Sequence, residues 1–374
     1  MAEAEFDRAK AKAFTQLMVR HLEGAAVSIM IEVGRRVGLF EAMATLGAVT
    51  SAEVAEKTGL SERYVREWLA AMVCGGIVEY AATERTYRLP REHAAGLTGV
   101  SSRNLTGMAE MFPLMNRVIP DVAEAFRTGR GVPYSAYQPD FTGLMDRRSR
   151  PRYDELLFSA YLAKPEGLVP RLEAGIRVAD VGCGTGYCIA QMARRFPKST
   201  FVGYDISSEG IREARAAAHG LANASFVVQD VMRLESAAPF ELITAFDAIH
   251  DQADPAGVLR RVRAALSPGG TFLMLDVWAS SELADNVGVP MAPYLYTMST
   301  MHCMSVSLAG GGPGLGTAWG HQVATRMLHE AGFTDVKLFE RVDPANSLYV
   351  ARRAEASISH DSPVSAGPIH SRGS

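Results

Sequence analysis

The stretch VADVGCGTGYCIAQMA joins an apolar run to a glycine-rich loop and then to a helical pattern. The apolar run ends in Asp180, and the loop contains Gly182, Gly184 and Gly186. Because glycine has no Cβ, such a loop at a strand-to-helix turn lets a ligand approach the backbone closely. The dinucleotide fingerprint requires glycine where this sequence has Tyr187, and a P-loop requires a Gly-Lys-Ser/Thr ending that the loop lacks. The loop is therefore predicted to hold a ligand of another kind.

More polar side chains follow the next apolar runs, which end in GYDIS, VVQD and FDAIHDQADP. In an open sheet, ligands bind beyond the carboxyl ends of the strands. Asp205 comes nineteen residues after Gly186, where an acid that binds a ribose is expected. A carboxylate after the third run can accept a hydrogen bond from an exocyclic amine. The candidates at these strand ends are Asp205, Ile206, Gln229, Asp230, Val231, Phe246, Asp247, His250 and Asp251.

The elements that must position these residues are seven strand-like runs that alternate with amphipathic helical runs. Apolar strands separated by helices are typical of a parallel sheet covered on both faces. The carboxyl-terminal half is therefore predicted to be a doubly wound α/β domain. The expected strands are 177–182, 200–206, 225–230, 242–249, 271–278, 335–342 and 347–353.

The amino-terminal part has the pattern of a winged helix. Thr50 or Ser51 caps a first helix, Gly59 interrupts it, and Ser61 caps a second helix that ends at two consecutive glycines. The alternating sequence IVEYAATERTYRL then predicts a small β-wing.

Two functions are open for such a unit, DNA binding and dimerisation. The second helix carries only Arg63 and Arg66 as basic residues, and Glu62 and Glu67 offset them. A reader of phosphates usually shows a richer basic stripe, so we expect a packing and dimerisation unit.

Bulk composition agrees with a globular protein that has no excess of basic charge. The 374 residues carry 38 Lys and Arg against 41 Asp and Glu, which gives a net charge of −3. This balance does not favour nucleic acid or an acidic membrane as a partner. The first residues are polar and mixed in charge, unlike a signal peptide, and the four cysteines form no C-x-x-C pair. We expect a cytoplasmic protein.

The combination of DVGCGTG, GYDIS, VQD and LSPGG resembles the motif series of class I S-adenosylmethionine-dependent methyltransferases, over roughly residues 170–353. The resemblance implies a seven-stranded Rossmann-like domain whose glycine loop contacts the amino-acid end of the cofactor, which carries no phosphate. By position, Asp180 and Gly182 line the methionine portion, and Asp205 holds the ribose hydroxyls. Asp230 and Val231 contact the adenine.

A winged helix before such a domain is similar to the dimeric small-molecule methyltransferases of bacteria and plants. The stretch AIHDQADP is similar to the HDW-type segment of plant-type O-methyltransferases, which implies that His250 is the general base. Gln252 stands where those enzymes have tryptophan. Asp251 or Asp247 could orient the imidazole. If the acceptor is carbon, Glu166 is the base to suspect.

Other residues are expected to contact the acceptor. Arg147 and Arg148, in the cluster DRRSRPR, could clamp a carboxylate or phosphate, although a solvated face is the commoner interpretation of such a cluster. The segment 279–320 is rich in Met and Tyr and then in Gly, and it is predicted to be a lid. The remaining candidates for acceptor contact are Tyr161, Tyr294, Met298, His302 and His321. No spacing requires a metal site.

The sequence thus predicts a winged-helix dimerisation domain (1–95), a helical connector (96–170), a catalytic domain (171–353) and a disordered tail (354–374). The expected function is methyl transfer from S-adenosylmethionine, to oxygen, on a small and largely apolar or anionic molecule of secondary metabolism. One alternative is C-methylation of a prenyl-type alkene. Another is a winged-helix transcription regulator that senses the cofactor.

Overall fold

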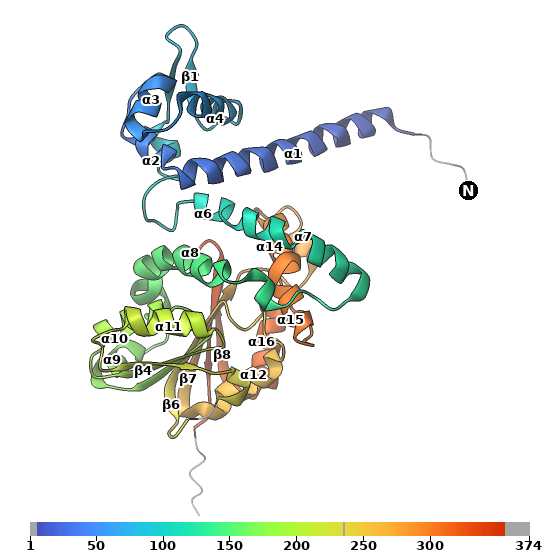
Figure 1. Cartoon of the computed structure of the whole chain (residues 1–374). Coiled ribbons are helices and arrows are strands. Elements are labelled where there is room, and N and C mark those ends of the chain that lie inside the picture. Colours follow the sequence, from blue (N-terminus) through green and yellow to red (C-terminus); the bar gives the residue numbers. More distant parts are fainter. Residues whose placement is uncertain (1–5, 235, 356–374) are drawn as a thin grey trace, which may run out of the picture.

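The computed structural model describes residues 6–234 and 236–355, which form three parts in chain order (Figure 1). A winged helix-turn-helix unit comes first, a helical connector follows, and a seven-stranded sheet with helices on both faces completes the chain. Of the predicted tail, residues 356–374 lie outside the described part. No helix within the described residues combines the length and the apolar character that a membrane span needs.

The amino-terminal unit contains a helix-turn-helix pair and a two-stranded wing, as predicted. Thr50 and Glu53 form a capping box, because each side chain accepts a hydrogen bond from the backbone N–H of the other (3.3 and 2.7 Å). Gly59 ends the first helix of the pair in a left-handed conformation (φ 67°). The elements are α1 (Arg8–Arg36), α2 (Leu39–Ala44), α3 (Ser51–Thr58), α4 (Glu62–Cys74), β1 (Glu79–Ala81), β2 (Thr86–Arg88) and α5 (Arg91–Ala94).

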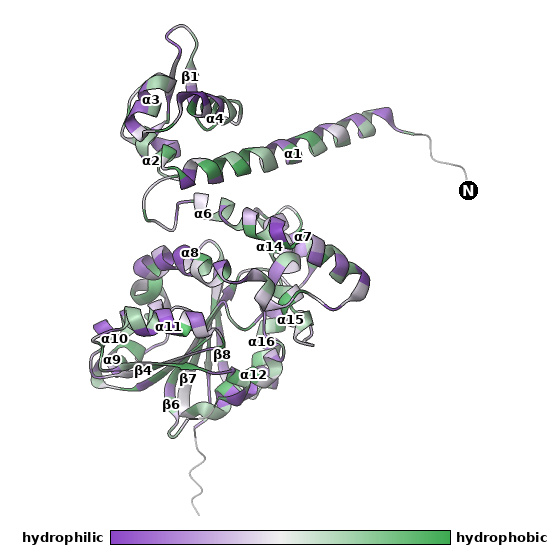
Figure 2. Cartoon of the chain, viewed as in Figure 1, coloured by the Kyte–Doolittle hydropathy of each residue, from purple (hydrophilic) through white to green (hydrophobic). Residues whose placement is uncertain are grey.

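Helix α1 is anchored only near its carboxyl end. The indole Nε1 of Trp68 in α4 donates to the Met30 carbonyl oxygen (2.8 Å), and Gly34 lets that ring lie directly against α1. Every residue from 12 to 26 is exposed, so most of α1 extends away from the rest of the chain (Figures 1 and 2).

The connector is helical and lies between the winged helix and the sheet (Figure 1). Two of its side chains reach the loop and helix that follow the first strand of the sheet: Asp146 accepts a hydrogen bond from the Thr185 hydroxyl, and Asp154 accepts one from the Tyr187 hydroxyl (2.7 Å). The elements are α6 (Thr106–Ala109), α7 (Met111–Thr128), the 3-10 turn η1 (Tyr134–Tyr137), α8 (Asp140–Leu156), the π-turn η2 (Leu157–Tyr161) and α9 (Leu168–Ala174).

The sheet confirms all seven predicted strands. Its order is β5-β4-β3-β6-β7-β9-β8, and β9 alone of these strands runs opposite to the others. The strands are β3 (Arg177–Val181), β4 (Thr200–Asp205), β5 (Ala224–Val228), β6 (Phe240–Phe246), β7 (Leu266–Val277), β8 (Thr334–Phe339) and β9 (Asn346–Arg352). The helices between them are α10 (Tyr187–Arg195), α11 (Ser208–Ala217), η3 (Val231–Arg233), α12 (Pro255–Ala265) and α16 (Gly320–Glu330).

Both faces of the sheet are buried, which explains the continuous apolar runs in its strands. Helices α9, α10 and α11 cover one face together with η2, and α12 and α16 cover the other. The order reverses at β3, whose neighbours are β4 and β6. Ligands of doubly wound domains bind at this point, beyond the carboxyl ends of the strands.

The predicted lid, 279–320, follows β7 and is largely helical. It contains α13 (Leu283–Asn286) and an unbroken helical run made of α14 (Ala292–Met298), the π-turn η4 (Ser299–Cys303) and α15 (Met304–Ala309). The Ser305 carbonyl oxygen accepts from the Val132 N–H (3.0 Å), and the Ser307 hydroxyl donates to the Gln252 carbonyl oxygen (2.8 Å). These contacts hold the segment against the connector and the loop after β6.

Candidate active site

The three glycines of the loop after β3 have different roles. All have positive φ, which favours glycine. A Cβ on Gly186 would lie 2.4 Å from the Phe226 ring, and one on Gly182 would lie 2.6 Å from Ala248 Cβ, so these two allow close packing. A Cβ on Gly184 would meet no atom within 4 Å, so the loop is open to a ligand at this glycine.

Two carboxylates lie beside the loop. Asp180 is buried and accepts a hydrogen bond from the Thr244 hydroxyl (2.6 Å), and burial raises the pKa of Asp180 to about 7. Asp205 accepts from the N–H groups of Gly184 and Ser207 (2.8 Å each). Burial raises the pKa of Asp205, while these hydrogen bonds oppose the increase. Each Asp205 oxygen keeps a lone pair for a ligand hydroxyl.

The ends of β4 and β5 form an edge that is partly apolar. Ile206 is 63% exposed, directly after Asp205, whose carbonyl oxygen accepts a hydrogen bond from the Gln229 N–H (2.9 Å). Asp230 is exposed and accepts from the Met232 N–H (2.9 Å), and Val231 is buried. Phe246 ends β6 and packs against the rings of Tyr153 and Tyr161 in the core.

His250 forms a buried pair with an acid that the sequence analysis did not select. Its Nδ1 lies 2.7 Å from Asp276 Oδ1, at the end of β7. The same oxygen accepts from Trp319 Nε1 (3.2 Å) and from the Val277 N–H (2.8 Å). Burial opposes a charge on His250, but the Asp276 carboxylate and the Cys303 thiol outweigh this, so its pKa is raised well above the usual value.

Neither Asp251 nor Asp247 is the acid that orients His250. Burial raises the pKa of Asp251 to about 6, and the charges of His250 and Asp276 also act on it, so Asp251 belongs to the same group of charges. Asp247 points to other partners. It accepts from Arg152 (2.7 Å) and from the Asn346 side chain (2.6 Å).

His302 lies in an aromatic box built by the connector and η4. It stacks on Phe141 with ring centroids 3.8 Å apart, and the rings of Tyr137 and Tyr134 approach it edge-on at 4.6 and 6.1 Å. Met298 is half-buried and packs against the apolar cluster that contains Tyr137. Burial raises the pKa of Tyr134, and the charges of Asp205 and Asp251 add to this increase.

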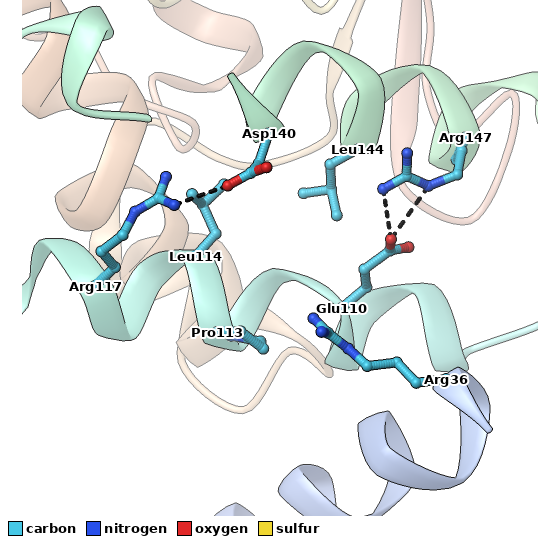
Figure 3. A pocket seen from close by; sticks show the side chains of 8 residues that line it. All are labelled: Arg36, Glu110, Pro113, Leu114, Arg117, Asp140, Leu144 and Arg147. Carbon is cyan, nitrogen blue, oxygen red and sulfur yellow. Dashed lines mark hydrogen bonds and ion pairs between the residues drawn. The ribbon is translucent and has the colours of Figure 1, made fainter. Parts of the chain in front are cut away.

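The arginines of DRRSRPR do not gather into one basic patch. Arg147 pairs with Glu110 (2.6 Å) at a cavity of about 300 Å³, which Arg117 and Asp140 also line as an ion pair (Figure 3). Arg148 donates to the Tyr294 hydroxyl (3.0 Å).

The next two arginines of the cluster have carboxylate partners of their own. Arg150 pairs with Asp146 (2.7 Å), and Arg152 pairs with Asp247 (2.7 Å).

The three remaining candidates have other surroundings. Tyr161 is fully buried and donates to the Asp343 carboxylate (2.5 Å). His321 hydrogen bonds through Nδ1 to the Ala279 carbonyl oxygen (3.1 Å). Glu166 is exposed in the turn before α9. Within residues 6–234 and 236–355, no three His, Cys, Asp or Glu side chains form a metal-binding group.

Two family models match the chain. A model described as an Rv2258c-like winged HTH domain matches residues 25–99, and one described as a methyltransferase domain matches residues 172–332. The trans-aconitate 2-methyltransferase of Deinococcus radiodurans is 37% identical over 110 residues, which are 29% of this chain and 41% of that protein. The match thus spans less than half the length of this relative.

Solved structures agree with the fold over nearly the whole chain. Human N-acetylserotonin methyltransferase in complex with S-adenosylmethionine has a TM-score of 0.67 at 19% identity, over 94% of this chain and 99% of that one. An O-methyltransferase family protein from Burkholderia thailandensis has a TM-score of 0.65 at 18% identity, over 91% and 98%. The chain therefore carries a winged-helix domain followed by a methyltransferase domain, and it has the fold of S-adenosylmethionine-dependent methyltransferases.

Proposed function

We propose that the protein transfers a methyl group from S-adenosylmethionine to a hydroxyl oxygen of a small, largely apolar molecule, with His250 as the base. The buried His250–Asp276 pair is the observation that supports this best. It lies where β6 and β7 end, at the same edge of the sheet as the glycine loop. A hydroxyl is a weak nucleophile until a base takes its proton, so an oxygen acceptor requires such a residue.

The residues around the glycine loop fit this cofactor. Gly184 leaves open space beside the backbone, where the methionine portion would lie. The free lone pairs of Asp205 suit the ribose hydroxyls, and the exposed Ile206 suits one face of the adenine. Asp180 is a buried acid whose charge a cationic ligand would stabilise. Asp230 is exposed at the end of the same edge, within reach of an exocyclic amine.

The contact with Asp276 favours the tautomer of neutral His250 that a base needs. When Nδ1 carries the proton and donates it to Asp276, Nε2 keeps a lone pair that can take the acceptor's proton. Asp276 then stabilises the imidazolium. S-adenosylmethionine bound at the glycine loop would supply the methyl group for the deprotonated oxygen. The side chains of the aromatic box exclude water from this step.

The test is the pH profile of methyl transfer in three proteins. In the wild type, kcat should rise with pH, and the midpoint should lie above the usual pKa of histidine because Asp276 stabilises the charged ring. His250→Gln should lose about 10²–10⁴-fold in kcat and keep its affinity for S-adenosylhomocysteine. Asp276→Asn should move the midpoint to lower pH. Full activity of His250→Gln would refute the assignment of His250 as the base.

The two alternatives have less support. C-methylation with Glu166 as base would require the acceptor to reach an exposed turn before α9. A DNA-binding regulator would need free cations on α4, whereas Arg63 pairs with Glu67 and Arg66 pairs with Glu62. Tight, salt-sensitive binding to random duplex DNA would nevertheless favour the regulator.

A homodimer is part of this proposal. Residues 12–26 of α1 are exposed, and apolar side chains lie along this stretch. A lone helix of this length is marginal in water unless its apolar side chains are covered. In a symmetric dimer, the α1 helices of the two copies would cover each other's apolar side chains. Symmetric dimers are the commonest homo-oligomers. The exposed apolar residues of this stretch are Phe14, Leu17, Met18, Val19 and Leu22.

A further inference from the structure

His302 is a buried polar side chain whose hydrogen-bonding capacity is unused. Only 1% of the residue is exposed, and neither Nδ1 nor Nε2 has a hydrogen-bond partner among the described residues. An unpartnered buried polar group costs on the order of 1–3 kcal/mol. A phenylalanine would fill the same space without that cost. The imidazole is therefore better explained by a ligand than by packing.

The imidazole offers one donor and one acceptor. Burial and the nearby charge of His250 lower the pKa of His302 to about 3, so the ring is neutral at physiological pH. A neutral ring suits an uncharged polar group, such as a hydroxyl, which can donate to one nitrogen or accept from the other. It gives no special stabilisation to a carboxylate.

The walls of the box are aromatic side chains, which suit contact with an aromatic ligand. Phe141 lies nearly parallel to the imidazole, at an interplanar angle of 14°. Tyr137 stands edge-on and donates its hydroxyl proton to the Met301 carbonyl oxygen (2.5 Å), which fixes the π-turn that carries His302. Tyr134 is fixed in turn by a hydrogen bond between its hydroxyl and that of Thr142 (3.0 Å).

The segment that carries His302 also contacts the surroundings of His250. Cys303, next to His302, accepts a hydrogen bond from the Thr317 hydroxyl (3.1 Å), and Trp319, two residues after Thr317, donates to Asp276, the partner of His250. The same helical run reaches the loop after β6, where the Ser307 hydroxyl donates to the Gln252 carbonyl oxygen (2.8 Å). A molecule bound at His302 would therefore lie beside the segments that hold His250. Both nitrogens of His302 are shut off from solvent, so a side chain at the edge of the imidazole must move before a ligand can hydrogen bond to them.

We propose that His302 binds a second polar group of the acceptor, which is an uncharged, planar aromatic molecule with at least two hydrogen-bonding groups. One of these groups is the hydroxyl at His250, and the other hydrogen bonds to the imidazole of His302. The proposal rests on the O-methyltransferase function given above and specifies its substrate class. It replaces the anionic acceptor suggested by Arg147 and Arg148, which already contact Glu110 and Tyr294.

The experiment compares two probes, a naphthol with one hydroxyl and a naphthalenediol with one on each ring. Binding to the full chain saturated with S-adenosylhomocysteine is measured by calorimetry. The wild type should bind the diol more tightly than the naphthol. His302→Phe keeps an aromatic ring but removes both nitrogens, so its affinity for the diol should fall about tenfold while its affinity for the naphthol is unchanged. His302→Gln should recover part of the preference for the diol.

Thermal unfolding separates recognition from packing. Without ligand, His302→Phe should raise Tm, because it removes two unpartnered polar atoms. Val306→Ala is the matched control, since Val306 packs against the same apolar cluster and carries no polar side-chain atom. It should lower Tm and leave the ratio of the two affinities unchanged.

Three outcomes would overturn the inference: equal affinities of the wild type for both probes, no binding of either probe, or a His302→Phe variant that keeps the wild-type ratio. The proposed function has its own readouts, which are the affinity for S-adenosylhomocysteine and the pH profile that depends on His250. A failure of those would refute the methyltransferase mechanism instead.

Discussion

At the scale of single residues, burial raises the pKa values of the carboxyl groups in the candidate site, and this makes their charge sensitive to a bound ligand. Asp180 illustrates this, because burial raises its pKa to about 7 and the nearby charge of Asp205 adds to the increase. At neutral pH a large share of Asp180 is protonated. S-adenosylmethionine carries positive charge on its sulfonium and amino groups, so its binding would favour the ionised form.

We therefore expect the affinity for S-adenosylmethionine to depend on pH through Asp180. Below pH 7 the carboxyl must lose a proton when the cofactor binds, so affinity should fall, by at most about tenfold per pH unit. Above pH 7 the affinity should level off. Calorimetry between about pH 5.5 and about pH 8 measures this, and Asp180→Asn should flatten the curve. A wild-type curve as flat as that of Asp180→Asn would show that Asp180 does not interact with the bound cofactor.

Sequence patterns placed the acids beside the glycine loop but did not find the partner of His250. Asp180 lies near the end of β3, just before the glycine loop, and Asp205 ends β4, so local spacing points to both. Asp276 was missed, although an acid inside the apolar run TFLMLDVW is unusual. Its role depends on β7 pairing with β6, which local sequence does not reveal.

At the scale of elements, helix α8 is fixed to the sheet through a buried polar network. Arg152 from α8 donates to Asp247 after β6 (2.7 Å) and to the Asn346 side chain at the start of β9 (2.6 Å). Asn346 in turn donates to Asp247 (2.6 Å). The arginine and the aspartate are 15% and 17% exposed at their side chains, so both charges are largely desolvated.

Breaking this network on one side should be costly. Arg152→Met leaves the Asp247 charge without its cation and should lower the free energy of unfolding by about 3–5 kcal/mol. The double variant Arg152→Met/Asp247→Asn removes both charges and should recover part of that loss. Urea unfolding of the two variants and of Asp247→Asn alone gives the coupling energy. Strictly additive losses would mean that the two side chains do not stabilise each other.

The sequence predicted where the elements begin and end better than how they pack. The seven strands and the helix-turn-helix pair follow from periodicity, glycines and caps, which are local signals. The aromatic box does not, because Tyr134 and Phe141 are more than 150 positions from His302 along the chain. The predicted lid is a wall of the box, and its helices were hidden by the many glycines after them.

At the scale of the whole molecule, the exposed part of α1 determines the expected assembly. Leu22 is 67% exposed and Phe14 is 60% exposed on a helix that few other elements contact (Figure 2). These side chains would lie at the centre of a contact between two copies. Their replacement by glutamate would place a charge there without disturbing the helix, because glutamate is a good helix former.

The wild type should be a dimer in light scattering after size-exclusion chromatography. Phe14→Glu/Leu22→Glu should shift it to monomer at the same concentration. His21→Glu is the control, because it adds a charge on the same helix at a polar, exposed position. A monomeric wild type at every concentration tested, or a double variant that stays dimeric, would contradict the assignment of α1 to the dimer contact.

The π-turns have a consequence for how acceptor preference could change in evolution. Each arises where a helix accommodates one extra residue, and η4 carries His302 within the unbroken run from α14 to α15. Deleting one residue from η4 would restore regular α-helix while α14 and α15 on either side keep their orientation. A single codon deletion would then replace the imidazole at the box with a neighbouring side chain. Lineages of this protein could thus diverge in substrate by small changes in length as readily as by point substitution.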